Sequence, residues 1–369
     1  MNTTALTEEQ IRELPKVSLH DHLDGGLRPV TILDLAQQAG IELPGGAPTD
    51  SAEALGQWFA TQADSGSLVE YLKTFDVTLS VMQSVEGLHR VAKEFVEDLV
   101  SDGVIYGEIR WAPEQHLEQG LSLEQAVEAV QAGLDAAVAA AEASGKNIQV
   151  GQLITAMRHN DRGMEIAELA LKYRDKGAVG FDIAGAEAGF PASKFADAFT
   201  HLANHMFPIT VHAGEADGVE SIRSALVDGR TLRLGHGVRI AEDIAALDAG
   251  DADVAGLGDV ARWVLERGIP LELSPSSNLQ TGAVAQWGTE MAQHPFDALY
   301  RLGFAVTVNT DNRLMSSTTL TKELLLLVEA FGYGREDLLL FQLNAAGGAF
   351  VRFEDREALV DALVSAYTS

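Results

Sequence analysis

The chain has 369 residues, 46% of them hydrophobic, so it is long enough to bury a large core. Its 26 lysines and arginines against 54 acidic residues give a formal net charge of −28, which disfavours binding to nucleic acid or to anionic membrane surfaces. There is no cysteine, which excludes disulfides and thiolate nucleophiles and leaves nitrogen and oxygen atoms as the ligands for any metal.

The N-terminal segment and the hydropathy predict a cytoplasmic protein. Residues 1–14 lack a basic start followed by an apolar block, so no signal peptide is expected. No run approaches the roughly 18 consecutive apolar residues of a membrane helix. The acidic, small-residue stretch at 248–259 is expected to form a surface loop. We therefore expect a small-molecule partner rather than a membrane or a nucleic acid.

Eight short β-rich segments recur along the chain, and helical patterns separate several of them. The segments are KVSLH (16–20), VIYGEIRW (104–111), IQVGQLIT (148–155), AVGFDIAG (178–185), FPITVHAG (207–214), LRLGHG (232–237), IPLELSP (269–275) and FAVTVNTD (304–311). Apolar residues recur at three- and four-residue intervals at 123–143 and 192–206, which is typical of helices. Eight alternating β and α units predict an α/β fold, the (β/α)8 barrel.

The first crossover is much longer than the others and contains several helical patterns. It begins after Gly26, and we expect residues 27–102 to form a helical cap over the mouth of the barrel. No linker or composition shift marks a second domain, so residues 1–369 are predicted to be a single barrel domain that carries this insertion.

Metal-capable residues stand at the ends of four predicted strands. His20 and His22 end the first strand, His212 ends the fifth, His236 the sixth and Asp311 the eighth. Barrel enzymes place their chemistry at these ends, and residues i and i+2 of a strand face the same side. A single His-x-His is more often structural than metal-binding, but the combined pattern favours a metal site. Imidazoles with a carboxylate suit Zn²⁺.

Glu215 follows His212 by three residues, in HAGE, so it can reach a substrate held at the metal without being a ligand itself. This position predicts a general acid or base. By contrast, His201 and His205 lie four apart on a predicted helix without the glutamate of the zincin motif, and we interpret them as ordinary helix residues.

Seven motifs, in this order along the chain, resemble those of the adenosine deaminase family. They are LPKVSLHDHLDG, AMRHN, GFDIAGAE, TVHAGE, LGHG, LELSPSSN and VNTDN, and the similarity spans roughly residues 14–350. The resemblance implies a zinc-dependent (β/α)8 barrel that hydrolyses the exocyclic amine of adenosine, and of 2′-deoxyadenosine, to give the inosine product and ammonia.

The resemblance also implies roles for the residues at the strand ends. It predicts one zinc ion per chain, with the ligands His20, His22, His212 and Asp311. Glu215 would donate a proton to the purine nitrogen N1, and His236 and Asp311 would orient and deprotonate the attacking water. A buried, electron-rich site can raise the pKa of Glu215 enough to keep it protonated.

Four residues are expected to contact the substrate by the same resemblance: His22, Asp24, Gly185 and Asn312. Asp24 would accept a hydrogen bond from a ribose hydroxyl, and the Gly185 amide would donate to a purine nitrogen. Asn312 stands where many family members have an aspartate near the purine nitrogen N7. Because an asparagine amide donates at any pH, this change preserves the contact.

Two further features bear on the comparison with the family: a predicted lid, and a second position, after Asn312, where the sequence differs from the family pattern. Leu68, Tyr71 and Phe75 match positions of an apolar lid, and their spacing predicts one shared helix face. A helix that merely packs on the barrel is the other interpretation. Ala186 stands where an acidic residue is common, which leaves the electrostatics near the base open.

Three alternative functions are compatible with parts of this pattern. Adenine deaminases of the superfamily commonly carry glutamate in place of Asp24, so Asp24 favours a nucleoside. Aminofutalosine deaminases remain an alternative, as does a non-catalytic nucleoside-binding barrel, which would have no use for Glu215. A binuclear site with a carboxylated lysine is disfavoured because the segment 178–185 has no lysine and Lys176 precedes it.

Overall fold

The computed structural model describes residues 6–245, 247 and 253–369. All eight predicted strands form: β1 (Lys16–His22), β2 (Val104–Trp111), β3 (Gln149–Met157), β4 (Ala178–Ala184), β5 (Thr210–Ala213), β6 (Arg233–His236), β7 (Leu271–Leu273) and β8 (Val306–Val308). Neighbouring strands are parallel and follow chain order in two four-stranded sheets, β1 to β4 and β5 to β8.

Isolated bridges join the two sheets into a ring. At one junction Asp21 pairs with Asp311, and the Asp311 N–H donates to the His20 carbonyl at 2.9 Å. At the other junction the Phe181 N–H donates to the Pro208 carbonyl at 3.0 Å. The predicted (β/α)8 barrel is confirmed. At the two places where the sheets meet, the pairing between neighbouring strands is reduced to a single bridge.

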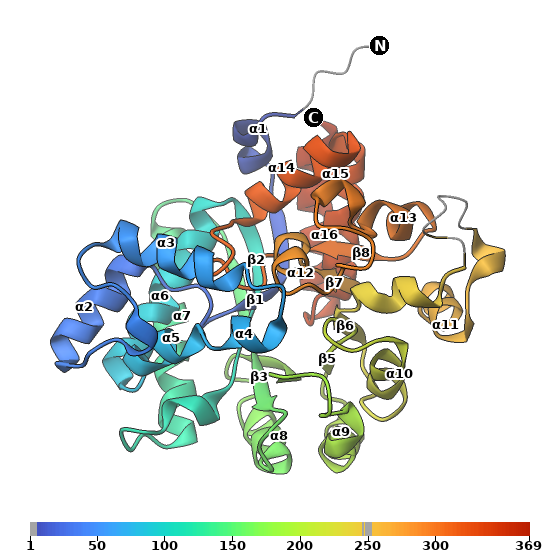
Figure 1. The fold of residues 1–369 in the computed structure, drawn as a ribbon. Coiled ribbons are helices and arrows are strands. Elements are labelled where there is room, and N and C mark those ends of the chain that lie inside the picture. The colour runs from blue at the N-terminus through green and yellow to red at the C-terminus, as the bar shows by residue number, and fades with distance from the viewer. Residues whose placement is uncertain (1–5, 246, 248–252) are drawn as a thin grey trace.

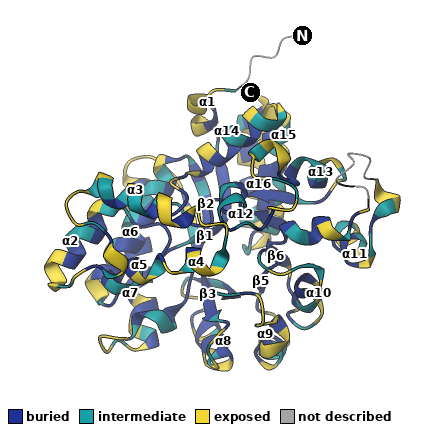
Figure 2. Ribbon diagram, viewed as in Figure 1, coloured by how far each residue is buried: buried dark blue, intermediate teal, exposed yellow. Residues whose placement is uncertain are grey.

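Helices surround the strands, and the segments between them include short 3-10 turns (Figure 1). Outside the first crossover the helices are α1 (Glu8–Glu13), α7 (Leu123–Ala143), α8 (Gly163–Lys172), α9 (Ala196–Asn204), α10 (Val219–Val227), α11 (Asp259–Arg267), α12 (Pro275–Gln280), α13 (Phe296–Arg301), α14 (Leu320–Phe331), α15 (Arg335–Gly348) and α16 (Phe353–Thr368). The strands are buried, whereas the outer helix faces are exposed (Figure 2). The predicted helix at 123–143 coincides with α7, which a capping box at Ser122 begins.

The first crossover contains a series of helices and a short 3-10 turn: α2 (Pro29–Ala39), η1 (Pro44–Gly46), α3 (Ala52–Ala63), α4 (Leu68–Leu72), α5 (Phe75–Val81) and α6 (Val85–Ser101). The expectation that Leu68, Tyr71 and Phe75 share one helix is wrong, because α4 ends before Phe75. The Thr74 hydroxyl and the Thr74 N–H both bond to the Tyr71 carbonyl, at 2.7 and 3.1 Å. A threonine that caps this carbonyl closes a tighter turn than an α-helix.

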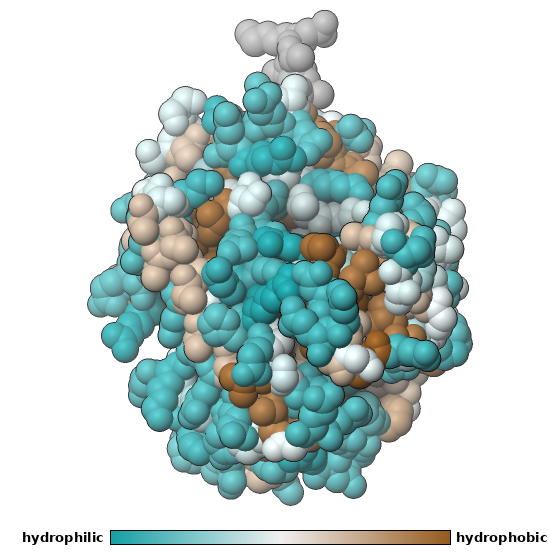
Figure 3. Space-filling view, turned by 90° about the vertical axis from the view of Figure 1, so that its left-hand side faces the viewer, coloured by the Kyte–Doolittle hydropathy of each residue, from teal (hydrophilic) through white to brown (hydrophobic). Residues whose placement is uncertain are grey.

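The surface matches the acidic composition. Seen from the side of the crossover helices, hydrophilic residues cover most of the surface and hydrophobic ones form separate patches (Figure 3).

In the described part of the chain, every helix is too short or too polar to cross a bilayer. Of the stretch 248–259 expected to be a loop, residues 248–252 lie outside the described residues, and the rest includes the 3-10 turn η6 (Val254–Gly256).

Buried charged groups occupy the interior of the barrel. Arg233 on β6 is fully buried and binds Glu108 on β2 and Glu272 on β7, and its guanidinium also donates to the Gly348 carbonyl at 2.7 Å. Burial alone would raise the pKa of Glu272, but Arg110 and Arg233 outweigh it and hold that pKa well below its ordinary value. Glu272 therefore stays ionised only because these cations accompany it.

Arg233→Met should strongly destabilise the fold. The substitution leaves Glu108 and Glu272 buried without this cation, and breaking a buried pair from one side costs about 3–5 kcal/mol. We expect a loss of that size in the unfolding free energy measured in urea. Arg301→Met is the control, since Arg301 pairs with Asp297 at an exposed position, and its cost should stay below about 1 kcal/mol. Equal losses in both variants would contradict this role of Arg233.

Candidate active site

Three histidines and one aspartate meet at the carboxyl ends of the strands. His20 and His22 belong to β1, His212 belongs to β5, and Asp311 follows β8. One ligand-capable atom from each lies within 4.8 Å of the others. The His22 Nε2 and His212 Nε2 atoms are 3.1 Å apart, and His20 Nε2 lies 3.3 Å from Asp311 Oδ1. Strand ends far apart in sequence thus place four potential ligands around one point.

Two carboxylates behind the histidines fix the orientation of the rings. Glu272 Oε2 lies 2.9 Å from His20 Nδ1, and Asp182 Oδ2 lies 2.9 Å from His212 Nδ1. Each carboxylate leaves the Nε2 atom of its histidine turned toward the cluster, which is how metal-binding histidines are commonly held. The sequence interpretation missed both carboxylates. The signal was present, because each is a lone acidic residue inside an apolar strand.

Backbone strain coincides with two predicted catalytic residues. His236 has φ of 59° and Asp311 has φ of 58°, a left-handed conformation that is unfavourable for a residue with a side chain. The Asp311 carboxylate is held by the Ser277 hydroxyl at 2.6 Å, and Asn278 Nδ2 lies 3.1 Å from His236 Nδ1. The fold therefore fixes both side chains from more than one direction.

Glu215 and His236 form a second group with Asp311. His236 Nε2 lies 3.4 Å from Glu215 Oε2, and both side chains are buried. Burial raises the pKa of Glu215 well above its ordinary value, and the charges of Asp311 and Glu187 add to the effect. Burial lowers the pKa of His236 well below its ordinary value. Both shifts favour the uncharged forms, a carboxylic acid beside a neutral imidazole, and such a pair suits proton transfer in both directions.

Glu187 organises the loop that carries Glu215. Its buried carboxylate accepts hydrogen bonds from the backbone N–H groups of Gly214 (2.6 Å), Glu215 (3.0 Å), Ala216 (2.7 Å) and Asp217 (3.0 Å) and from the Ser221 hydroxyl (2.5 Å). This role was not predicted, because nothing in the local sequence connects Glu187 to residues so far along the chain. Ala186, where the family commonly has an acidic residue, is half-buried and uncharged, so the acidic group near the 214–217 loop is the neighbouring Glu187.

Apart from His22 in β1, the residues expected to contact substrate lie in the segments that follow β1, β4 and β8. Asp24 is buried, its Oδ1 atom has no hydrogen-bond partner within the described residues, and burial raises its pKa to about 7. Gly185 has φ of 97°, a conformation that favours glycine. The Asn312 side chain packs against Gly25, where a Cβ atom would collide with it. One glycine of the LDGG turn is therefore needed to make room for Asn312.

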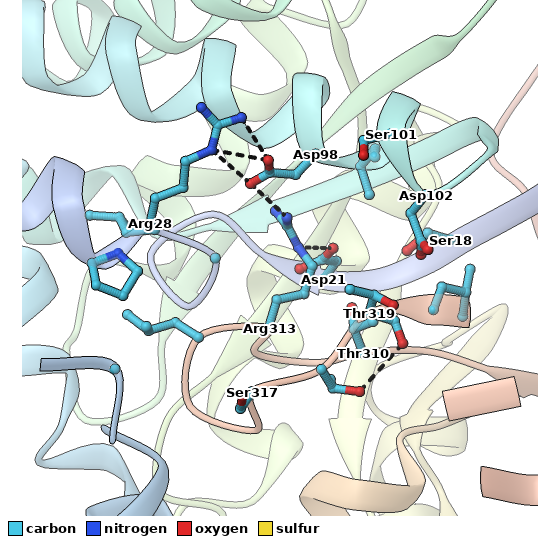
Figure 4. A pocket seen from close by; sticks show the side chains of 18 of the residues that line it. Ser18, Asp21, Arg28, Asp98, Ser101, Asp102, Thr310, Arg313, Ser317 and Thr319 are labelled. Carbon is cyan, nitrogen blue, oxygen red and sulfur yellow. Dashed lines mark hydrogen bonds and ion pairs between the residues drawn. The ribbon is translucent and has the colours of Figure 1, made fainter. Parts of the chain in front are cut away.

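Asp21 stands between His20 and His22 on β1, and this alternation predicts that its side chain lies on the other face of the strand. Figure 4 shows it turned toward Arg313. Its carboxylate accepts a hydrogen bond from Arg313 Nε at 2.9 Å, and Arg313 also binds Asp98 of α6 at 3.3 Å. These residues line a cavity of about 520 Å³. None of the four potential metal ligands lines this cavity, so it is separate from the candidate active site.

A protein family, curated proteins and solved structures all match this chain over nearly its whole length. The adenosine deaminase family profile matches residues 15–366. The chain is 52% identical over 362 residues to an adenosine deaminase of Mycobacteroides abscessus, covering 98% of this chain and 97% of that protein. Among solved structures, an Arabidopsis thaliana N6-methyl-AMP deaminase is 27% identical with a TM-score of 0.78, covering 98% of this chain and 99% of that one. An amidohydrolase from Burkholderia ambifaria with bound zinc is 23% identical with a TM-score of 0.81, covering 100% and 95%.

Glu187→Gln should loosen the loop that carries Glu215. The amide keeps the size of the side chain but turns an N–H donor toward backbone N–H groups, so at least one buried amide loses its acceptor. We expect hydrogen exchange of the 214–217 amides to accelerate by about tenfold or more, measured by mass spectrometry. Glu220→Gln, an exposed change on α10, is the control. Unchanged exchange at 214–217 would show that Glu187 does not hold the loop.

Proposed function

Since this chain belongs to the adenosine deaminase family and hydrolyses adenosine to inosine and ammonia, we propose that one zinc ion binds at the carboxyl ends of its strands. The proposed ligands are His20, His22, His212 and Asp311. Three imidazole nitrogens and one carboxylate oxygen are a common zinc ligand set. The zinc-containing amidohydrolase of the same fold supports the choice of metal.

The protonation states of these side chains fit a metal. Burial lowers the pKa values of His22 and His212, so both imidazoles are neutral at physiological pH. Burial would raise the pKa of Asp311, but its interactions with His20 and the other nearby histidines outweigh burial and hold the pKa well below its ordinary value, so Asp311 is a carboxylate. The buried His20 Nε2 atom has no hydrogen-bond partner among the described residues. Metals bind these deprotonated forms, and a cation would satisfy the unpaired nitrogen.

The proposed reaction relies on Glu215 and His236 in opposite roles. Zinc, when bound, supplies a water that is nucleophilic at neutral pH. Neutral His236, beside Asp311, accepts the proton that this water loses as it attacks C6 of the purine. Protonated Glu215 gives its proton to N1, which breaks the ring aromaticity and makes C6 electrophilic. The C6–N bond then breaks as the amine takes the proton held by His236 and leaves as ammonia, and the proton of the C6 hydroxyl returns Glu215 to its acid form. The observation that carries the proposal is this acid and base pair, 3.4 Å apart, next to the four potential ligands.

Substrate binding is proposed to use the buried polar groups around the cluster. The Asp24 carboxylate, whose Oδ1 atom has no partner within the described residues, accepts a hydrogen bond from a ribose hydroxyl, and the Gly185 N–H donates to a purine nitrogen. The Asn312 amide donates to N7, and His22 borders the bound nucleoside. We further propose that residues 27–102, with helices α2 to α6, act as a cap over this site.

Removing a proposed ligand should reduce bound zinc and activity together. In His212→Ala we expect both to fall, because the variant lacks one imidazole donor. In Asp311→Ala activity should fall more steeply than zinc, since Asp311 also orients the attacking water. His201→Ala on α9 is the control. Zinc is measured by elemental analysis and activity by ammonia release from adenosine. Full activity in metal-free His212→Ala protein would refute the site, and two tightly bound metals per chain would refute a single ion.

Glu215→Gln should separate chemistry from binding. The amide keeps size and hydrogen bonding but cannot deliver the proton to N1, so turnover should fall by about 10²–10⁴-fold or more while zinc content stays unchanged. Glu220→Gln should retain activity. In the wild-type enzyme, activity should decline at high pH, as Glu215 loses its proton above its raised pKa, and at low pH, as His236 gains one below its lowered pKa. Turnover of Glu215→Gln within a few-fold of wild type would eliminate Glu215 as the proton donor.

A further inference from the structure

The cavity beside Asp21 and Arg313 lies between the first crossover and the barrel. The crossover contributes the start of α2 and residues of α3 and α6, and the barrel contributes residues of β1 and of the segment 310–320 after β8. Its volume of about 520 Å³ falls within the roughly 300–1,000 Å³ that is common for small-molecule sites. This crossover cavity is therefore large enough to hold a ligand of its own.

Four polar side chains on the barrel side of the crossover cavity each carry an atom without a hydrogen-bond partner among the described residues. These atoms are Ser18 Oγ, Asp21 Oδ1, Thr310 Oγ1 and Arg313 Nη2. Ser18 and Asp21 are 1% exposed and Thr310 is 2% exposed, and all four side chains are drawn among those that line the cavity in Figure 4. Buried polar atoms usually have partners, because an unmade hydrogen bond is costly. Their grouping around one cavity indicates a molecule that completes them.

Ion pairs hold the unpaired donor and acceptor in place. Arg313 Nε donates to Asp21 Oδ2 at 2.9 Å, and Arg313 Nη1 donates to Asp98 Oδ2 at 3.3 Å. Asp98 also accepts from Arg28 Nη2 at 2.6 Å, and the Arg313 guanidinium lies 4.1 Å from the centre of the Phe95 ring. These contacts use one oxygen of Asp21 and two nitrogens of Arg313. They leave one carboxylate acceptor and one guanidinium donor available on two side chains that are already paired with each other.

The charges around the crossover cavity favour a neutral ligand. The described residues that line it include three cations and three anions, Arg12, Arg28, Arg313, Asp21, Asp98 and Asp102. Since these charges balance, an ionic ligand would add a charge without a partner in a partly buried space, which is costly. The remaining lining residues are mostly serines, threonines and leucines, and none of the described ones is aromatic. The wall therefore offers hydroxyl groups and aliphatic surface, but no ring on which a flat base could stack.

We propose that the crossover cavity binds a free sugar or polyol, a neutral molecule with several adjacent hydroxyl groups. A hydroxyl both donates and accepts, so the ligand donates to Asp21 Oδ1 and accepts from Arg313 Nη2, and further hydroxyls bond to Ser18 and Thr310. The carbon skeleton packs against the aliphatic lining residues.

The position of the site gives binding a measurable consequence. The ligand contacts the crossover on one side and β1 on the other, so it binds the folded chain and raises its unfolding midpoint by mass action. Asp21 stands between His20 and His22, so the ligand also supports, from the opposite face, the strand that carries two of the proposed metal ligands.

Titration with D-ribose and with glycerol tests the site, followed by calorimetry and by the unfolding midpoint. We expect saturable binding of both to the wild-type protein. Ser18→Ala and Thr310→Val, made separately, each remove one hydroxyl from the cavity wall and should raise the Kd about tenfold. Thr61→Val, which removes a hydroxyl on the exposed face of α3, is the control and should leave the Kd unchanged. Tetrahydropyran, a ring of similar size without hydroxyl groups, should not bind.

Asp24→Ala distinguishes the crossover cavity from the candidate active site, where a ribose hydroxyl is proposed to bind. Binding of D-ribose should persist in this variant. Binding that is lost in Asp24→Ala but unchanged in Ser18→Ala and Thr310→Val would place the sugar at the candidate active site and overturn the proposal. Inosine, added to Asp24→Ala, should bind at least about tenfold more weakly than D-ribose, and tighter binding would overturn the assignment to a free sugar. The absence of saturable binding up to about 100 mM would mean that water alone fills the cavity, and would also overturn it.

Discussion

Arg110, buried inside the barrel, is the group on which the geometry of the site depends. From β2 its guanidinium binds Asp182 at 2.9 Å and Glu272 at 2.6 Å, and these are the carboxylates that hold His212 and His20. One cation therefore orients two imidazoles from strands on different sides of the ring. An uncompensated charge in such a place costs several kcal/mol, so the arginine and its two carboxylates form a unit that the fold must keep whole.

The same balance of charge explains why buried carboxyl groups in this barrel differ in protonation. Burial would raise the pKa of Asp182, but His212 and Arg110 reverse the effect and lower it to about 2. Glu215 is buried as deeply, yet its strongest electrostatic neighbours are the anions Asp311 and Glu187, so its pKa moves the other way. A cation or an anion beside each group thus decides between an ionised positioning residue and a protonated acid.

The sequence contained the information for the strand ends but not for their support. His20, His22 and Asp311 could be predicted to converge, because parallel strands of a barrel bring their carboxyl ends to one face and residues two apart point the same way. Glu187 could not be placed, because its partners lie in another loop. The spacing of apolar residues predicts one helix through Phe75, whereas α4 ends at Leu72. Apolar spacing does not reveal that a threonine hydroxyl can cap a carbonyl and tighten the turn.

Burial of the site also constrains how substrate enters. Asp24 and Glu215 are only 4% and 5% exposed, so under the proposed function a nucleoside reaches them only if the proposed cap moves aside. Helix α4 has five residues, too few to be stable alone, so its position depends on contacts such as that between Gly66 and Gln280. If α4 acts as part of the proposed cap, opening such a short helix costs little, whereas closing it would exclude water and strengthen the charge interactions around Glu215. In the proposed function the motion would therefore be confined to the cap, while the hydrogen-bonded strands of the barrel keep their places.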